Sequence, residues 1–254
     1  MLVTSAAGEK KWVSISWLPV LNVSSPRGLL DGLTAIEAAL VELWRANTWV
    51  SGQQDSSGLF FPVDGASLRR VQTEPGNVHV GYAVCDGQLA GGIVLHKGSA
   101  IGPYAANTVA WAKSTLGASE VAFVRSLCVS KSLRGFGIGR EMLRAARKLA
   151  RHLEAPIVVG HLRVSPELDE RHQRAYSDAG FSVLGDAVTT TLYQEGDLKW
   201  ADIGGRETPA DPAHLSALET VEFSYRPVGA PAAKHRIGVA GQVERRASQL
   251  AASA

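Results

Sequence analysis

Apolar and polar positions alternate in some segments of the chain and recur at helical spacing in others. Alternation with β-branched and aromatic residues over Trp12–Leu18 predicts an opening strand. Apolar residues three and four positions apart from Leu29 to Trp49 predict the first long helix. Two β-rich runs, Val78–Cys85 and Leu89–His96, flank Asp86-Gly87 and predict a hairpin with a tight turn. The amino-terminal part therefore predicts a strand, a helix and a hairpin.

The later elements follow from the same patterns. Ile101–Leu116 is small and apolar, and its periodicity does not distinguish a helix from a covering loop. Basic residues lie opposite the apolar face of a helical pattern over Ile138–Leu153. The remaining predicted elements are strands over Val121–Val129 and Pro156–Val164, a helix over Leu168–Ala179 ending at Gly180, and a closing hairpin of Phe181–Leu184 and Ala187–Tyr193 across Gly185-Asp186.

These elements predict one α/β domain of α+β type over residues 1–194. Beyond it, turn-forming residues surround Leu215–Phe223, which could form a strand or a short helix. From Pro227 onward the chain has four Lys/Arg against one Glu. We therefore expect residues 195–254 to be a partly ordered extension with a basic tail from 227.

Composition and charge narrow the class of protein. The 254 residues are 45% hydrophobic and 20% charged, and 26 basic against 24 acidic residues give a net charge of +2. This balance argues against an unspecific nucleic-acid-binding protein. The two cysteines, Cys85 and Cys128, lie in predicted strands without the spacing of a disulfide framework or a metal site. With no secretion-signal pattern and no run of about 18 apolar residues, we expect a cytoplasmic protein that does not enter the membrane.

One segment carries distinctive chemistry, because a strand, a short polar turn, alternating glycines and a basic helix follow one another. A helix amino terminus offers unsatisfied N–H donors and a positive partial charge, and glycine lets the backbone approach a ligand closely. The segment therefore predicts a phosphate site, to which Arg134 and Arg140 would add positive charge. The alternative is a tight turn that binds nothing. Its central sequence is Arg134-Gly135-Phe136-Gly137-Ile138-Gly139.

Neither common nucleotide loop fits this segment. It lacks the Gly-Lys-Ser/Thr of a P-loop, and it follows an antiparallel hairpin instead of opening a βαβ unit. The chain instead resembles the GNAT superfamily of acyl-CoA N-acyltransferases, whose signature Arg/Gln-x-x-Gly-x-Gly/Ala is met in full by Arg134 to Gly139. A second family element, an aromatic residue shortly before Gly-Phe, is met by Tyr176 ahead of Gly180-Phe181. The resemblance covers roughly Trp12–Tyr193.

The resemblance implies a fold and a cosubstrate. The fold is a mixed, mostly antiparallel twisted sheet flanked by helices and splayed between its fourth and fifth strands. Acetyl-CoA is the implied cosubstrate, and no metal is required. Its pyrophosphate would be bound by Arg134, Gly135, Phe136, Gly137, Ile138, Gly139 and Arg140, and its pantetheine arm by the backbone of Leu127, Cys128 and Val129.

The resemblance also implies direct attack of a neutral amine on the thioester within a ternary complex. Tyr176 is then the candidate general acid for the departing thiolate, with a packed tyrosine as the alternative. The strand position where many relatives carry a glutamate is Phe123 here, so the base is open. Glu120 is a weak candidate, since a solvated charge at a strand end is the commoner role. His161 has a suitable pKa range but is more often a hydrogen-bonded core residue in such a strand.

Three further expectations concern the surroundings. Asp169 stands near the place of a cofactor-contacting asparagine in relatives, although a helix cap is the favoured role. Cys128 is expected to be a small buried hydrophobe and not a covalent nucleophile. The acceptor would be a small-molecule or peptide amine, and a homodimer is compatible with the sequence. Aromatic residues that could line its pocket or belong to the core are Trp44, Trp49, Phe60, Phe61, Tyr104 and Trp111.

Two other functions are open at this point. The segment from His172 to Phe181 is faintly similar to phage Mom DNA-modification proteins, which are built on the GNAT fold, and the basic tail could contact phosphates. The intact glycine signature favours acyl-CoA use over this nucleic-acid modifier. The third function is a non-catalytic acyl-CoA sensor that binds the cofactor and leaves amines unmodified.

Overall fold

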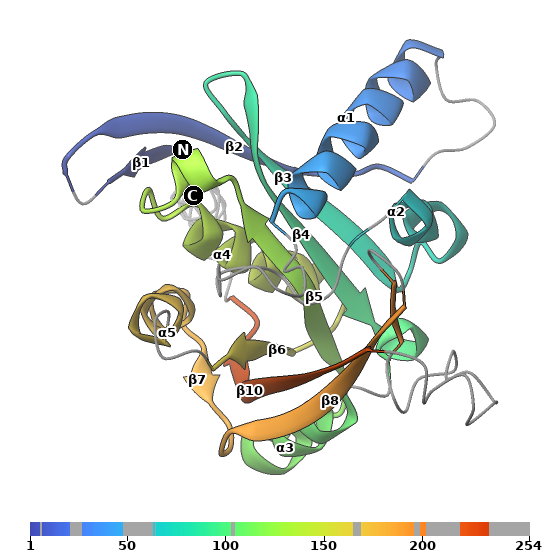
Figure 1. The fold of residues 1–254 in the computed structure, drawn as a ribbon, viewed down its shortest axis with the longest axis vertical. Helices are drawn as coiled ribbons and strands as arrows, with labels where there is room; N and C mark the ends of the chain where they lie inside the picture. Colours follow the sequence, from blue (N-terminus) through green and yellow to red (C-terminus); the bar gives the residue numbers. More distant parts are fainter. Residues whose placement is uncertain are drawn as a thin grey trace, which may run out of the picture.

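A computed structural model describes residues 1–5, 7–20, 27–47, 63, 65–102, 105–164, 169–195, 199–201 and 219–233. Figure 1 shows the helices and strands. The helices are α1 (Arg27–Arg45), α2 (Gly65–Thr73), α3 (Ala106–Leu116), α4 (Ile138–His152) and α5 (Asp169–Asp178), with 3-10 turns η1 (Gly98–Ala100) and η3 (Lys131–Leu133). The strands are β1 (Leu2–Thr4), β2 (Lys10–Trp17), β3 (Val78–Cys85), β4 (Gln88–Lys97), β5 (Val121–Val129), β6 (Ile157–Arg163), β7 (Ser182–Val183), β8 (Val188–Glu195), β9 (Lys199–Ala201) and β10 (Glu219–Pro231).

Most elements lie where the hydrophobic pattern predicts them. The hairpin of β3 and β4 is confirmed, and its turn residues Asp86 and Gly87 both have positive φ, at 49° and 80°. This is the left-handed geometry that an Asp-Gly hairpin turn requires. The undecided segment over Ile101–Leu116 contains α3, which begins at Ala106 and ends before Gly117 in the left-handed conformation.

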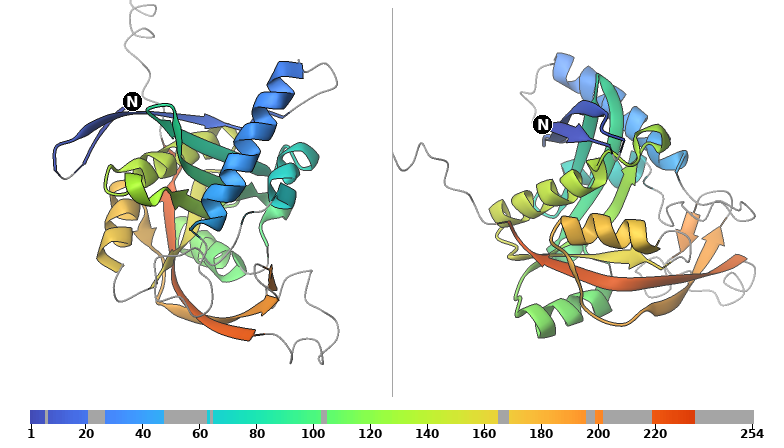
Figure 2. Two further views of the ribbon diagram at one scale, coloured as in Figure 1. Left: turned by 45° about the horizontal axis from the view of Figure 1, so that its top comes forward. Right: turned by 90° about the vertical axis from the view of Figure 1, so that its left-hand side faces the viewer.

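The strands form one mixed sheet in the order β1-β2-β3-β4-β5-β6-β10-β8-β9, with β7 also paired to β10. The neighbours pair antiparallel, and the exception is the parallel pair of β5 and β6. Figure 2 shows helices on both faces of this twisted sheet. The predicted mixed and mostly antiparallel α/β architecture is therefore confirmed.

Each face of the sheet buries its own apolar cluster. Helix α4 packs Ile138, Met142, Leu143 and Ala146 against one face, and α5 lies beside it over β6. On the other face α1 and α2 cover β3 and β4, while α3 covers β6 and β10. Two glycines of β4 permit this close packing. A Cβ at Gly91 would lie 2.8 Å from the Cys128 carbonyl, and one at Gly92 would lie 2.7 Å from the Trp44 ring.

The closing hairpin predicted across Gly185-Asp186 is wrong. β7 and β8 do not pair with each other, because both pair with β10, at Val228↔Val183 and at Tyr225↔Val188. Gly185-Asp186 therefore lies where one irregular strand is interrupted alongside β10. A Cβ at Gly185 would lie 2.9 Å from the Trp111 indole, so close packing against α3 accounts for this glycine.

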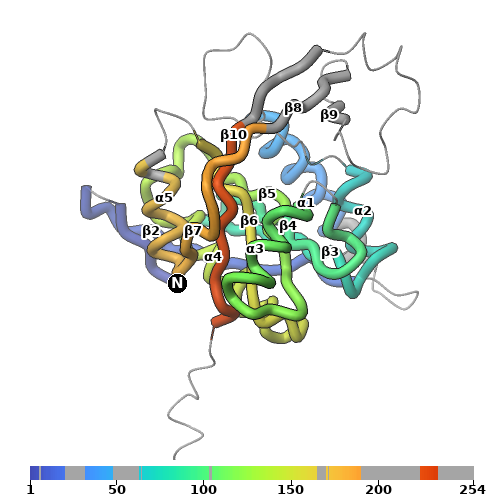
Figure 3. Tube along the Cα trace, turned by 90° about the horizontal axis from the view of Figure 1, so that it is seen from below, coloured from blue at the N-terminus to red at the C-terminus, as the bar shows by residue number. Residues whose placement is uncertain are grey.

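The boundary expected at residue 194 also needs correction, since β10 belongs to the centre of the sheet. It pairs with β6 from Tyr225↔Arg163 to Pro231↔Ile157. Figure 3 shows β10, in red, alongside β6 and β7. Tyr225, Val228 and Ala230 are buried, so this part of the predicted extension belongs to the core. Sequence patterns missed the pairing because residues 195–218 separate β10 from its neighbours, and pattern alone does not predict such long-range contacts.

Truncation tests this assignment. A chain ending at Gln194 lacks β10 and exposes the inner edge of β6, so we expect it to lose cooperative thermal unfolding. A chain ending at Ala233 keeps every described strand and should melt within about 3 °C of the full chain. Circular dichroism melts of both chains measure the difference. A cooperative transition in the shorter chain would contradict the placement of β10 in the core.

Candidate active site

The pairing of strands β5 and β6 ends halfway along their length, and we call the opening between them beyond this point the fork. Their parallel pairing runs from Val121↔Ile157 to Val124↔Gly160, and no further pair joins them among the described residues. Beyond that point β5 continues to Val129 beside β4 alone, while β6 continues beside β10. The splay predicted between the fourth and fifth strands is therefore present. These predicted strands are β5 and β6, because the short β1 precedes the first predicted strand. The splay leaves one side of the β5 backbone over Leu127–Val129 without a strand partner.

A β-bulge marks the start of this fork. β4 pairs Val94 with Ser126 and Leu95 with Val124, so Arg125 is the extra residue of β5. A bulge bends its strand and increases the local twist. Arg125 thus bends β5 away from β6 at the point where their pairing ends.

The loop after β5 has the geometry that its glycines predict. Gly135 and Gly137 have φ values of 91° and 79°, and Gly137 is the residue before α4. Because glycine carries no side chain to cap the helix, the first-turn N–H groups of α4 remain available to an anion. Phe136 and Ile138 are buried, with the Lys11 ammonium 5.3 Å from the centre of the Phe136 ring. These two side chains anchor the loop, so only their backbone could contact a phosphate.

Both arginines of the loop make contacts within the protein. Arg134 donates from Nε to the Val129 carbonyl at 3.3 Å and from Nη2 to Asn47 Oδ1 at 2.6 Å. Arg140 lies 3.1 Å from Glu141 Oε1 and 3.8 Å from Asp178 Oδ2. The positive charge of Arg140 is therefore shared with two carboxylates in this structure.

Tyr176 reaches the fork from α5. The site for a Cβ on Gly160, the last β6 residue paired to β5, lies 3.8 Å from Tyr176 Cε1. The Tyr176 ring meets Phe181 edge to face, with centroids 5.3 Å apart. Burial raises the pKa of Tyr176 to about 12, so the phenol is protonated at neutral pH. The structure thus places the Tyr176 ring beside Gly160, where the pairing of β6 with β5 ends.

The structure does not bring Glu120 to this place. Glu120 is exposed just before the first residue of β5, seven residues ahead of Leu127. An extended strand of that length spans roughly 20 Å, so its carboxylate is far from the fork. Asp169 is the first residue of α5, and its side chain lies outside those that the structure describes.

His161 faces the side of the sheet opposite Tyr176. It lies 2.7 Å from Thr108 Oγ1 on α3 and stacks on Tyr225 at a centroid distance of 3.9 Å. Burial and the nearby positive charge of Arg125 lower its pKa to about 3. A histidine with such a pKa is a weak base at neutral pH. Its contacts match the core role that the sequence favours.

Cys128 and the described aromatic candidates are packing residues. The Cys128 thiol is buried 3.8 Å from the Leu43 carbonyl, and burial raises its pKa to about 12, against the smaller opposing effect of Arg134. Trp44 is fully buried and donates to Ser126 Oγ at 2.9 Å. Trp111 packs α3 against Gly185. The other aromatic candidates, Trp49, Phe60, Phe61 and Tyr104, lie outside the described residues.

No sequence pattern points to Asn47 as a functional residue. It follows the last turn of α1, is 5% exposed, and donates from Nδ2 to the Leu43 carbonyl at 2.8 Å. A polar residue after a helix usually suggests an ordinary helix end. Only the fold brings Asn47 against Arg134, which lies 87 positions later in the sequence.

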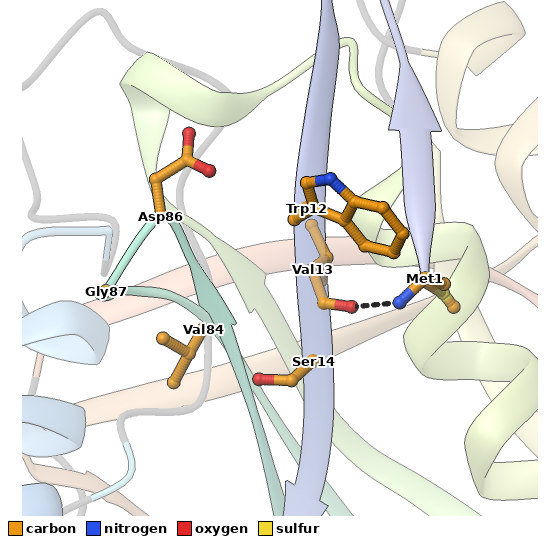
Figure 4. Close-up of a pocket in the computed structure, with 7 residues that line it drawn as sticks. All are labelled: Met1, Trp12, Val13, Ser14, Val84, Asp86 and Gly87. Carbon is orange, nitrogen blue, oxygen red and sulfur yellow. Dashed lines mark hydrogen bonds between the residues drawn. The ribbon is translucent and has the colours of Figure 1, made fainter.

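One pocket of the described chain lies away from the fork. Figure 4 shows a pocket of about 310 Å³ on the outer strands, lined by Met1, Trp12, Val13, Ser14, Val84, Asp86 and Gly87. It lies on β2 and β3, on the far side of β4 from the fork. The described residues contain no group of three or more His, Cys, Asp or Glu placed to hold a metal ion. Within the same residues, no helix is both long and apolar enough to cross a membrane.

One comparison with known protein families gives a match. The sequence model of the acetyltransferase (GNAT) family matches residues 42–181, which is more than half of the chain. A search of curated protein sequences gives no match.

Three solved acetyltransferase structures are among those found to be similar to this chain. The ribosomal-protein-S18-alanine N-acetyltransferase of Escherichia coli is 10% identical, with 89% of this chain and 98% of that chain covered and a TM-score of 0.46. A GNAT-family acetyltransferase from Streptococcus pneumoniae is 12% identical over 87% and 99% of the two chains, with a TM-score of 0.49. An N-acetyltransferase from Staphylococcus aureus Mu50 is 8% identical over 87% and 98%, with a TM-score of 0.48.

Two buried histidines predict a stability loss on acidification. Burial, with Arg125 acting in the same direction, lowers the pKa of both His96 and His161 from 6.5 to about 3. The unfolded chain therefore binds more protons than the folded chain between these values, and stability falls as the pH falls below 6.5. At pH 5 each histidine should account for about 2 kcal/mol of lost unfolding free energy.

Urea unfolding at pH 7.5 and pH 5 measures this loss. His161→Gln keeps polar atoms near Thr108 and removes one titrating group, so it should halve the loss due to the two histidines. An unchanged pH dependence in His161→Gln would show that His161 is not buried in its neutral form.

Proposed function

The chain belongs to the acetyltransferase (GNAT) family, and from this membership we propose that it transfers an acetyl group from acetyl-CoA to a primary amine. The amine attacks the thioester carbonyl carbon directly while both substrates are bound, and the carbon–sulfur bond then breaks. The fork between β5 and β6, which runs directly into the glycine loop, is the observation that carries the proposal.

Continuity between strand and loop supports one extended cofactor site. The N–H groups of the first turn of α4 suit the pyrophosphate, because they are donors at the positive end of a helix. The pantetheine arm carries amide groups that can pair with the open side of β5 over Leu127–Val129, as a strand would. Backbone N–H donors on the same segment would stabilise the oxyanion that forms on the thioester.

Tyr176 is the proposed proton donor to the sulfur of coenzyme A. Its position at Gly160 and its protonated phenol support this role. When the carbon–sulfur bond breaks, the electron pair stays on sulfur and the phenol proton neutralises the thiolate. Tyr176 would then be reprotonated from solvent before the next turnover.

No side chain is proposed as the base. Glu120 lies at the far end of β5, and His161 faces the other side of the sheet with a pKa of about 3. An acceptor that binds as the neutral amine needs only to lose a proton to water after attack. The proposed acceptor is accordingly a small-molecule or peptide amine whose neutral form is accessible near neutral pH.

A substitution in the loop tests cofactor binding. Gly137→Glu should abolish coenzyme A binding in calorimetric titration, because a Cβ there lies 3.0 Å from the Arg140 guanidinium and the carboxylate would repel phosphate. Gly117→Glu is a matched control with a similar φ of 67°, since a Cβ there has open space after α3. The control should bind like the unmodified chain. Binding by folded Gly137→Glu would place the pyrophosphate elsewhere.

A second substitution tests the proton donor. Tyr176→Phe keeps the ring that packs on Phe181 and removes only the hydroxyl. We expect unchanged coenzyme A affinity and about 10²-fold slower thiol release with an amine acceptor. Acceptors are found by screening amines and nucleic acids with the unmodified chain. An unchanged rate in Tyr176→Phe would reduce Tyr176 to a packing residue.

Intact-mass measurement tests direct transfer. A thiol with a pKa of about 12 is almost fully protonated near neutral pH and is a poor nucleophile. We therefore expect no acetyl adduct on the protein after incubation with acetyl-CoA alone. An adduct that disappears in Cys128→Ala would instead establish a covalent intermediate on that residue.

A further inference from the structure

The last turn of α1 is fastened to β5 and its loop by three contacts. Trp44 Nε1 donates to Ser126 Oγ at 2.9 Å, and the Cys128 thiol lies 3.8 Å from the Leu43 carbonyl. The third contact, from Arg134 Nη2 to Asn47 Oδ1 at 2.6 Å, reaches the glycine loop itself. Helix α1 therefore contacts the strand and the loop of the cofactor site from the opposite face of the sheet to α4.

The Asn47 amide has a defined orientation. Its Nδ2 donates to the Leu43 carbonyl at 2.8 Å, which leaves Oδ1 directed at Arg134. A flipped amide would place its NH₂ group against the guanidinium, where both groups are donors. At 5% exposure the Asn47 side chain has little room to move. Asn47 is thus a fixed acceptor for an arginine that is largely exposed.

Arg134 links that acceptor to the end of the strand. Its Nε donates to the carbonyl of Val129, the last residue of β5, while Nη2 bonds Asn47. The guanidinium therefore closes the segment from Val129 to Arg134 into a ring of defined shape. Hydrogen bonds in which the donor is charged are stronger than neutral ones, so the contact with Asn47 can hold this shape.

We propose that Asn47 is a positioning residue for the coenzyme A loop, which it holds in its binding conformation through Arg134. Asn47 acts through another side chain and not by contact with the cofactor. The inference rests on the proposed function, because it assumes that the loop after β5 binds coenzyme A. Its consequence is that a residue of α1, far from the glycine signature in sequence, sets cofactor affinity.

A double-mutant cycle tests the coupling of the two residues. Calorimetric titration with coenzyme A compares the unmodified chain with Asn47→Ala, Arg134→Ala and the double variant. We expect Asn47→Ala to raise the Kd at least about tenfold, as loss of one hydrogen bond to a charged group would. In the Arg134→Ala background the same change should have no further effect, because the partner is already absent. Equal Kd values for Asn47→Ala and the unmodified chain, or losses that multiply in the double variant, would overturn the proposal.

Two further variants separate positioning from general destabilisation. Asn47→Asp keeps an oxygen acceptor opposite Arg134 and should bind coenzyme A within about twofold of the unmodified chain. Trp44→Phe removes the neighbouring bond to Ser126 without touching Arg134, so it should lower the melting temperature and leave the Kd unchanged. A Kd for Asn47→Asp as weak as that of Asn47→Ala would count against the acceptor role. Failure of the unmodified chain to bind coenzyme A would instead refute the proposed function.

Discussion

The interruption of the pairing between β5 and β6 is the constraint on which the site depends. Four residue pairs join the two strands, and the bulge at Arg125 then bends β5 away while β6 continues beside β10. Backbone N–H and C=O groups need partners, and one side of β5 over Leu127–Val129 has none from a neighbouring strand. A ligand with amide groups can supply them. The arrangement of the sheet backbone therefore supports the proposed site for an extended cofactor before any side chain is considered.

The fork persists because its two strands are held from outside. β4 pairs with β5 from Val129 to Ala122, and β10 pairs with β6 from Arg163 to Ile157. Each strand therefore has one complete partner and can leave the other without unravelling. The late strand β10 is accordingly part of the active-site architecture, although it begins well after the glycine signature.

The two faces of the fork differ in chemistry. On the face of α4 and α5, Tyr176 packs against the apolar cluster. The other face has the buried His96 and Thr108 and the partly buried His161. Both histidines are neutral at neutral pH because desolvation and Arg125 lower their pKa values to about 3. Because these histidines must be protonated when the chain unfolds in acid, they lower the free energy of unfolding as the pH falls. This face of the sheet is therefore the acid-sensitive one. Helix α1 connects β5 with the glycine loop, since residues at its carboxyl end contact both.

The sequence by itself determined the elements whose signals are local. The Asp86-Gly87 turn needs positive φ, the alternating glycines need the same freedom before α4, and the apolar stripe from Ile138 needs one buried face. These requirements are met within a few residues, so pattern alone located the hairpin, the loop and the helix. The proposed roles of the loop and of Tyr176 rest on the same short motifs.

Only the tertiary structure decided which distant segments meet. It placed β10 between β6 and the strands predicted to form a closing hairpin, and it brought Asn47 to Arg134. None of these outcomes has a local sequence signature. Any strand can pair with the open edge of another strand, and a side-chain amide can accept a hydrogen bond from any nearby donor. The choice among them depends on the packing of the whole sheet, in which β10 completes β6 and the last turn of α1 lies against β5.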